Sequence, residues 1–146
     1  MDIICDIDGT LLDITARIPW IKKASPPNWK RFREEWWSDT PIESIVTIIQ
    51  TLGEHSEHNV IIASGRTEKE RPQTELQLHR LFINYNALFM RATGDFRPDY
   101  IVKEEILARI KANGYEPKLA FDDRQQVVDM WRRNGIRCAQ VDVGNF

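Results

Sequence analysis

The residues with the clearest chemical potential lie at positions 5–10, which read Cys-Asp-Ile-Asp-Gly-Thr. Asp6 and Asp8 follow an apolar run that is typical of a buried strand, and Gly9 allows the chain to turn immediately afterwards. Open α/β sheets carry their active sites at the C-terminal ends of their strands. Two carboxylates at such an end predict a pocket for a divalent metal ion and a phosphate. A solvated strand edge with an ordinary Asp-Gly turn is the alternative that this stretch alone leaves open.

A second group of polar residues follows the apolar run at 59–63. It consists of Ser64, Gly65 and Arg66. A hydroxyl, a backbone N–H and a guanidinium at a strand end are suited to hold phosphate oxygens. A loop with a surface arginine is the alternative, and the Asp-x-Asp-Gly-Thr stretch upstream favours the phosphate site.

A lysine and a pair of acids complete the set. Lys103 lies early in a helix expected at about 98–112 and shares its apolar stripe, so its ammonium is expected to face the sheet. A lysine that snorkels to solvent is the alternative. Asp122 and Asp123 end another apolar run, and adjacent carboxylates repel each other there unless a cation joins them. They predict the second half of a metal site.

The elements that position these residues alternate between strands and helices, which predicts a Rossmann-like three-layer α/β/α fold with a five-stranded, mainly parallel sheet. Thr40 is expected to cap the first long helix, with Pro41 in its first turn and Gly53 just beyond its end. The strands are expected at 2–7, 59–63, 87–90, 118–121 and 136–141, and the helices at about 41–52, 71–82, 98–112 and between 124 and 135.

The segment at about 12–39 shows no clear strand and is expected to be a small cap inserted after the first strand. It carries four of the five tryptophans, with basic residues between them. Such a mixture is able to stack against and neutralise a nucleic-acid end, or the tryptophans form a small core of the segment while the basic residues are solvated. The tryptophans are Trp20, Trp29, Trp36 and Trp37, and the basic residues are Lys22, Lys23, Lys30, Arg31 and Arg33.

Length and composition predict a single domain over residues 1–146. With 20 basic and 22 acidic residues the net charge is −2, so no global field favours nonspecific binding of nucleic acid, and any such contact must be local. Cys5 and Cys138 lie in apolar runs and are expected to be buried thiols. No apolar run approaches the ~20 residues that span a bilayer, and no signal peptide is recognised, which predicts a cytoplasmic protein without a membrane partner.

The ordered motifs resemble those of the haloacid dehalogenase (HAD) superfamily of phosphohydrolases. The similarity is closer to the 3′-phosphatase domain of phage polynucleotide kinase-phosphatases, and Arg17 also falls at the spacing where that family carries an arginine. No P-loop is present, so the resemblance implies a stand-alone phosphatase. The stretches that carry it are Asp-x-Asp-Gly-Thr at 6–10, Ser-Gly-Arg at 64–66, Val-Lys-Glu-Glu-Ile at 102–106, Lys-Leu-Ala-Phe-Asp-Asp-Arg at 118–124, the run at 126–133 and the final Gly-Asn-Phe at 144–146.

Residue types and resemblance together assign a role to each group. Asp6 is expected to attack phosphorus and form an aspartyl-phosphate, and Asp8 to protonate the leaving oxygen and later deprotonate water. An all-oxygen ligand set favours Mg²⁺. Its expected ligands are the Asp6 carboxylate, the Asp8 backbone carbonyl, Asp122 and Asp123. The residues expected to stabilise the phosphoryl oxygens are Thr10, Ser64 and Lys103. Those expected to bind the substrate phosphate are Arg17, Gly65 and Arg66.

The leading hypothesis is a Mg²⁺-dependent polynucleotide 3′-phosphatase acting on DNA or RNA ends, with a separate polynucleotide kinase and a ligase as functional partners. One alternative is a HAD phosphatase of free nucleotides or another small phosphomonoester. The other is a non-catalytic module that binds phosphate ends. The presence of both Asp6 and Asp8 argues against that module, because binding alone needs no acid–base carboxylate. No oligomeric state is predicted.

Overall fold

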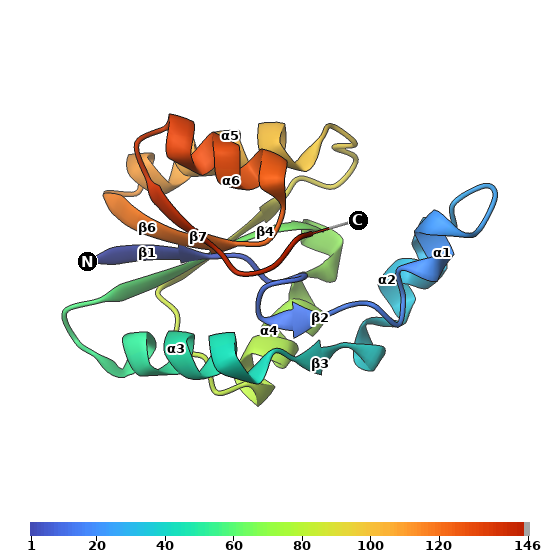
Figure 1. Ribbon diagram of the computed structural model, residues 1–146, viewed down its shortest axis with the longest axis horizontal. Coiled ribbons are helices and arrows are strands. Elements are labelled where there is room, and N and C mark those ends of the chain that lie inside the picture. Colours follow the sequence, from blue (N-terminus) through green and yellow to red (C-terminus); the bar gives the residue numbers. More distant parts are fainter. Residues whose placement is uncertain (145–146) are drawn as a thin grey trace.

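A five-stranded parallel sheet with helices on both faces forms the body of the protein, and the computed structural model describes it over residues 1–144 (Figure 1). The strand order is β5-β4-β1-β6-β7, and every pairing is parallel. This confirms the predicted three-layer α/β fold. The strands are β1 (Asp2–Cys5), β4 (Asn59–Thr67), β5 (Ala87–Arg91), β6 (Pro117–Asp122) and β7 (Arg137–Gln140). The long helices are α3 (Glu43–Glu54), α4 (Arg71–Arg80), α5 (Asp99–Ala112) and α6 (Gln125–Arg133).

The sheet is buried on both faces, which explains why its central strands read as continuous apolar runs. Ile3 and Cys5 face α3 and α4, whereas Ile4 and Ile61 face α5 and α6. Figure 1 shows these two helical layers above and below the sheet. Full burial of each isoleucine contributes roughly 1.5–3 kcal/mol, so the two cores hold the strand ends in fixed positions.

The register of the parallel strands brings the functional residues to one edge. Cys5 pairs with Ile62 on one side and with Phe121 on the other. The residues that follow Cys5 therefore emerge beside those that follow Ile62 and Phe121. β4 continues to Thr67, four residues beyond the predicted end at 63, and so carries the Ser-Gly-Arg stretch inside the strand.

The predicted start and end of the first long helix are wrong. Thr40 and Pro41 form the short strand β3 (Thr40–Pro41), which pairs with β2 (Leu12–Asp13), and α3 starts only at Glu43 without a side-chain cap. The pairing closes the inserted segment at its base, which removes these residues from the helix. Gly53 lies inside α3 instead of ending it, and position 53 requires a glycine because a Cβ there would collide with the backbone carbonyl of Asn84.

The segment between β2 and β3 forms an arm that projects from the sheet (Figure 1). It contains α1 (Pro19–Lys22), α2 (Trp29–Glu34) and the 3₁₀ turn η1 (Trp36–Ser38). The tryptophans of the described arm are at most partly buried, so the expectation of a small core holds only in part, and stacking against a nucleic-acid end stays a prediction. Trp20 is covered by the guanidinium of Arg31, whose Cζ lies 3.6 Å from the ring centroid, while Trp29 and Trp37 are 52% and 70% exposed.

One smaller expectation is confirmed in part. Both cysteines are free thiols as predicted, but only Cys5 is buried, whereas Cys138 is partly buried. In α4 the side chains of Thr74 and Leu78 face the core while Leu76 is exposed. Within residues 1–144 no helix has the length and apolar character needed to cross a membrane. Asn145 and Phe146 of the final motif lie outside the described residues.

Candidate active site

One half of the site is built around Lys103, which lies on the inner face of α5 as predicted and is almost completely buried. Its Nζ donates to Asp6 Oδ1 at 2.7 Å and to Asp122 Oδ2 at 2.9 Å. Asp6 comes from the end of β1, and Asp122 is the last residue of β6. We call Lys103, Asp6, Asp122 and Asp123 the lysine half of the site.

The lysine half carries more acidic than basic groups. Burial lowers the pKa of Lys103, but the charges of Asp122, Asp6 and Asp99 outweigh burial and raise it well above its ordinary value. Burial raises the pKa of Asp6, and the charge of Lys103 opposes that shift without reversing it. The ammonium therefore stays charged, while three carboxylates compete for it.

The second half of the site surrounds Asp8 with two buried arginines. Arg66 donates from Nε to Asp8 Oδ2 at 3.0 Å and from Nη2 to Oδ1 at 2.6 Å, and Arg17 Nη2 reaches the same Oδ1 at 3.1 Å. Asp39, at the end of the arm, accepts Arg17 Nε at 2.7 Å and Arg66 Nη2 at 3.1 Å. We call Asp8, Asp39, Arg17 and Arg66 the arginine half of the site.

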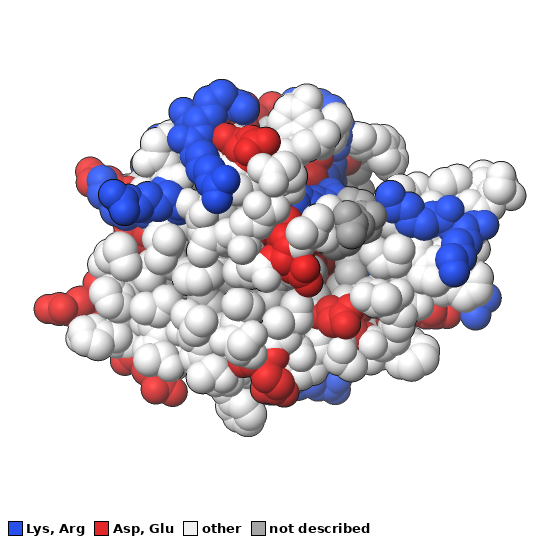
Figure 2. Space-filling model, in the orientation of Figure 1, with Lys and Arg blue, Asp and Glu red and all other residues white. Residues whose placement is uncertain are grey.

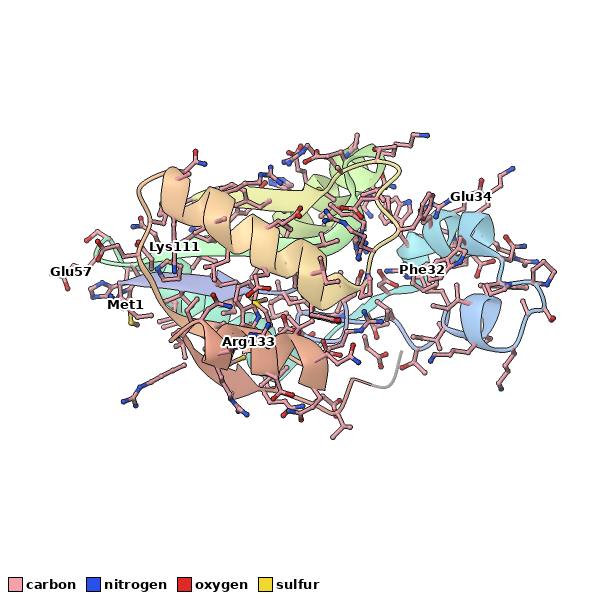
Figure 3. All side chains as sticks on the ribbon, turned by 90° about the horizontal axis from the view of Figure 1, so that it is seen from above. Met1, Phe32, Glu34, Glu57, Lys111 and Arg133 are labelled. Carbon is pink, nitrogen blue, oxygen red and sulfur yellow. The ribbon has the colours of Figure 1, made fainter. Side chains whose placement is uncertain are left out.

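The arginine half is balanced in charge. Burial raises the pKa of Asp8, but the charge and hydrogen bonds of Arg66 and the charge of Arg17 outweigh it, so the net shift is downward. Asp8 is therefore a carboxylate near neutral pH. Arg17 also stacks on Phe32 of α2, with Cζ 4.4 Å from the ring centroid, so the arm and the site share this residue. Figure 3 labels Phe32 where α2 faces the sheet.

The structure brings all the predicted site residues to this end of the sheet. The remaining ones, Thr10, Ser64 and Gly65, each have their own contacts there. Thr10 Oγ1 donates to Asp6 Oδ2 at 3.3 Å, and Ser64 Oγ accepts the backbone N–H of Arg66 at 3.2 Å. Gly65 passes so close to Asp99 that a Cβ would collide with its carboxylate. Arg17 and Arg66 are bonded to acids of the arginine half, so their predicted contacts with substrate stay a prediction.

The donor set of the lysine half fits a hard divalent cation. Carboxylate oxygens of Asp6, Asp122 and Asp123 all lie within 4.8 Å of one another. Asp123 is buried, and within the described residues 1–144 its Oδ1 has no hydrogen-bond partner. Burial and the charge of Asp122 raise the pKa of Asp123 to about 6. A buried carboxylate oxygen without a partner, in an all-oxygen cluster, is the environment that Mg²⁺ binding would relieve.

Several residues that bond to the site were not singled out from the sequence, among them Asp39, Asp99 and Trp131. Asp39 has a fully buried side chain between the two arginines, and no motif marks it. Asp99 lies 3.5 Å from Lys103 Nζ, and its position one turn before Lys103 was a usable signal. Trp131 donates from Nε1 to Asp122 Oδ2 at 3.1 Å, as expected of a buried indole that needs a partner.

The fold is shared with solved hydrolases. A haloacid dehalogenase-like hydrolase from Streptococcus pneumoniae superposes with a TM-score of 0.64 at 13% identity, covering 94% of this chain and 82% of that chain. This likeness shows an HAD-like fold. A chain of the Pnkp1/Rnl/Hen1 complex matches more closely, with a TM-score of 0.81 and 34% identity, covering 99% of this chain and 47% of that chain.

The sequence comparisons identify the family. A family model described as "Polynucleotide kinase PNKP phosphatase domain" matches residues 1–146. The chain belongs to this family of HAD phosphatase domains. An Autographa californica nuclear polyhedrosis virus protein named "Putative bifunctional polynucleotide kinase/RNA ligase" is 26% identical over 131 residues, which are 89% of this chain and 17% of that protein. The chain thus spans less than half the length of these relatives.

Proposed function

We propose that this phosphatase removes 3′-phosphates from nucleic-acid ends with the help of Mg²⁺ and through an aspartyl-phosphate on Asp6. The observation that carries the proposal is the pairing of Asp6 and Asp8 at one sheet edge in a member of the PNKP phosphatase-domain family. One carboxylate faces a lysine beside an acidic cluster, and the other is held by two arginines. This division suits a nucleophile and a proton-transfer group.

In the first step, an oxygen of Asp6 attacks phosphorus, and the ester bond to the 3′ oxygen of the nucleoside breaks. Lys103 and Thr10 bond to different oxygens of the Asp6 carboxylate and hold it in a fixed orientation. Such orientation reduces the entropy lost on reaching the transition state. In the second step, water attacks the aspartyl-phosphate, inorganic phosphate leaves and Asp6 is restored.

Asp8 transfers protons in both steps. It protonates the departing 3′ oxygen in the first step and accepts a proton from the attacking water in the second. The arginines keep Asp8 ionised in the free protein, so its resting form matches the basic role. The negative charge of an arriving phosphate raises the pKa of Asp8 and allows it to carry the proton that the first step needs.

Asp6, Asp122 and Asp123 would hold Mg²⁺, together with the Asp8 backbone carbonyl. When bound, Mg²⁺ supplies positive charge that stabilises the phosphoryl oxygens. Ser64 and Lys103 donate hydrogen bonds to the same oxygens in this proposal, and Thr10 Oγ1 does so once its hydroxyl turns from Asp6 to the phosphoryl group. We assign Arg17 and Arg66 primarily to Asp8, because each donates to its carboxylate.

The names of the relatives support the rest of the proposal. The viral relative is named as a polynucleotide kinase/RNA ligase, and the structurally similar chain belongs to a Pnkp1/Rnl/Hen1 complex. We therefore propose that a polynucleotide kinase and a ligase act at the same strand breaks as this phosphatase. Removal of a 3′-phosphate leaves the 3′-hydroxyl that a ligase requires.

The test is phosphate release from a short oligonucleotide with a 3′-phosphate, measured with Mg²⁺ and with EDTA. The 5′-phosphate isomer, a 3′-mononucleotide and p-nitrophenyl phosphate serve as comparison substrates. We expect Mg²⁺-dependent release from the 3′-phosphorylated oligonucleotide and a loss of at least about 10⁴-fold in Asp6→Asn. Asp129→Asn, an exposed acid on α6, is the matched control. Faster release from the mononucleotide or the 5′ isomer would contradict the proposal.

A further inference from the structure

A groove runs from the catalytic residues to the arm. It has a volume of about 500 Å³, within the range of about 300–1,000 Å³ typical of small-ligand sites. Gly9 and Asp123 line its inner end, while α1 lines its outer end. The groove is therefore continuous with the proposed active site and leads away from it along the chain that carries the arm.

The walls of the groove differ in chemistry. Ile14, Ile18 and Pro19 provide an apolar surface, and Lys22 and Lys23 lie at the outer end. Ile18 and Lys22 are four residues apart and so lie on one face of α1. Two further acidic side chains, Asp13 and Asp142, also line the groove, together with Thr15, Ile42, Val143 and Gly144. A ligand with an apolar body and a negative charge at its far end would fit only with that charge toward the lysines.

The two lysines differ from the arginines of the site. Within residues 1–144, neither Lys22 nor Lys23 has an ion-pair partner, and both are exposed. Arg17 and Arg66, by contrast, are buried and bonded to acids. On the arm, Arg31 is bonded to Glu35 and Lys30 lies 3.8 Å from Glu34. The charges of Lys22 and Lys23 therefore remain available to a ligand. Figure 2 shows basic side chains gathered on the arm.

We infer that this groove binds the 3′-terminal nucleoside of a single-stranded end, and that Lys22 and Lys23 hold the phosphodiester on its 5′ side. The inference rests on the proposed function. With the terminal phosphate at Asp6, the nucleoside lies along the apolar wall, and the next phosphate reaches the outer end of the groove. Asp13 and Asp142 disfavour the opposite orientation by repulsion. The structure thus assigns substrate binding to two lysines of the arm.

The experiment uses substrates with a 3′-phosphate on one, two or three nucleotides. A single nucleotide lacks the inner phosphodiester, whereas two nucleotides supply it. For wild type we expect kcat/KM to rise at the step from one to two nucleotides and to change little at three. Lys22→Ala/Lys23→Ala should lose this step, with about a tenfold higher KM for the dinucleotide and a weaker dependence of that KM on salt concentration.

Two further variants make the result specific. Lys22→Arg/Lys23→Arg keeps the charge and should keep the step. Lys111→Ala/Lys118→Ala removes two exposed lysines elsewhere and should behave as wild type; Figure 3 labels Lys111 at the opposite end of the molecule from the arm. A thermal melt of each variant checks folding. A higher KM at an unchanged melting temperature shows that the alanine variant has lost substrate binding and not its folded structure.

The outcomes distinguish the inference from the proposed function. Loss of the length step in the alanine variant alone supports the inference. Retention of the step in that variant, or no step in wild type, overturns the inference while the 3′-phosphatase proposal stands. Hydrolysis of p-nitrophenyl phosphate without release from any 3′-phosphorylated nucleotide overturns the proposed function and the inference with it.

Discussion

The two halves of the site handle buried charge in opposite ways. In the arginine half, two guanidiniums face two carboxylates, and paired hydrogen bonds connect them. In the lysine half, one ammonium bonds the carboxylates of Asp6 and Asp122, and among residues 1–144 a buried oxygen of the third carboxylate, Asp123, has no hydrogen-bond partner. The arginine half is complete as the chain folds, whereas the lysine half has a negative excess that a cation would neutralise.

The difference follows from the side chains used. A guanidinium presents a planar fork that bonds both oxygens of a carboxylate, so two of them are able to fix Asp8 and Asp39 together. An ammonium is a compact charge that leaves carboxylate oxygens available. The protein thus combines a rigid support for proton transfer with an acidic site suited to metal and phosphate.

The largest effect on stability is expected for Lys103→Met, which removes the ammonium from the lysine half. Two buried carboxylates then lose their shared partner, so the free energy of unfolding should fall by about 3–5 kcal/mol. Phosphate release should fall at least about 100-fold. Urea denaturation and the phosphate assay measure both, with exposed Lys118→Met as control. Wild-type activity in Lys103→Met would remove the lysine half from the proposed mechanism.

The next effect concerns metal binding. If the lysine half binds Mg²⁺, saturating Mg²⁺ should stabilise the folded protein by about 2.7 kcal/mol at a hundredfold excess over Kd. Thermal melts with Mg²⁺ and with EDTA measure the shift. Asp123→Asn should lose most of it, and exposed Asp129→Asn should retain it. Equal stabilisation of both variants would place the metal elsewhere.

Asp123 and Asp8, one from each half of the site, should also respond to pH with opposite signs. In EDTA, the raised pKa of Asp123, about 6, favours the protonated folded form, so stability should fall as pH rises from about 4 to about 6. The lowered pKa of Asp8 adds stability that is present above its unfolded value of about 3.9 and is lost below it. The measurement is the free energy of unfolding against pH.

Single variants separate these two pH dependences. Asp123→Asn should reduce the fall in the free energy of unfolding between about pH 4 and 6, and Asp8→Asn should reduce its fall below about pH 4. If Asp123→Asn leaves the fall between about pH 4 and 6 unchanged, other groups of the lysine half cause it.

The smallest effect is expected at an exposed ion pair on the arm, which serves as a reference for the buried ones. Arg31→Ala removes the guanidinium that covers Trp20 and bonds Glu35. We expect a loss of about 0.5–1 kcal/mol by thermal denaturation and wild-type phosphate release. A loss above about 2 kcal/mol would show that the arm and the sheet unfold together.

Much of this arrangement was predictable from local patterns. Apolar runs and glycines located the strands, and the inward face of α5 followed from the position of Lys103 on its apolar stripe. Parallel strands end at a common edge, so Asp6, Ser64 and Asp122 were expected to meet. The start of α3 was not predictable, because β2 and β3 pair across the inserted segment and override a favourable capping pattern.

The sequence by itself determined the fold class, the family and the residues that gather at the sheet edge, because those depend on periodic burial and on strand ends. Only the tertiary structure decided which basic side chains are paired with buried acids and which remain available to a ligand. Asp39 comes from the arm and pairs with Arg17 and Arg66. Lys22 and Lys23, which follow Arg17 by only a few residues, stay exposed. Such pairing depends on contacts between distant residues, which local sequence does not encode.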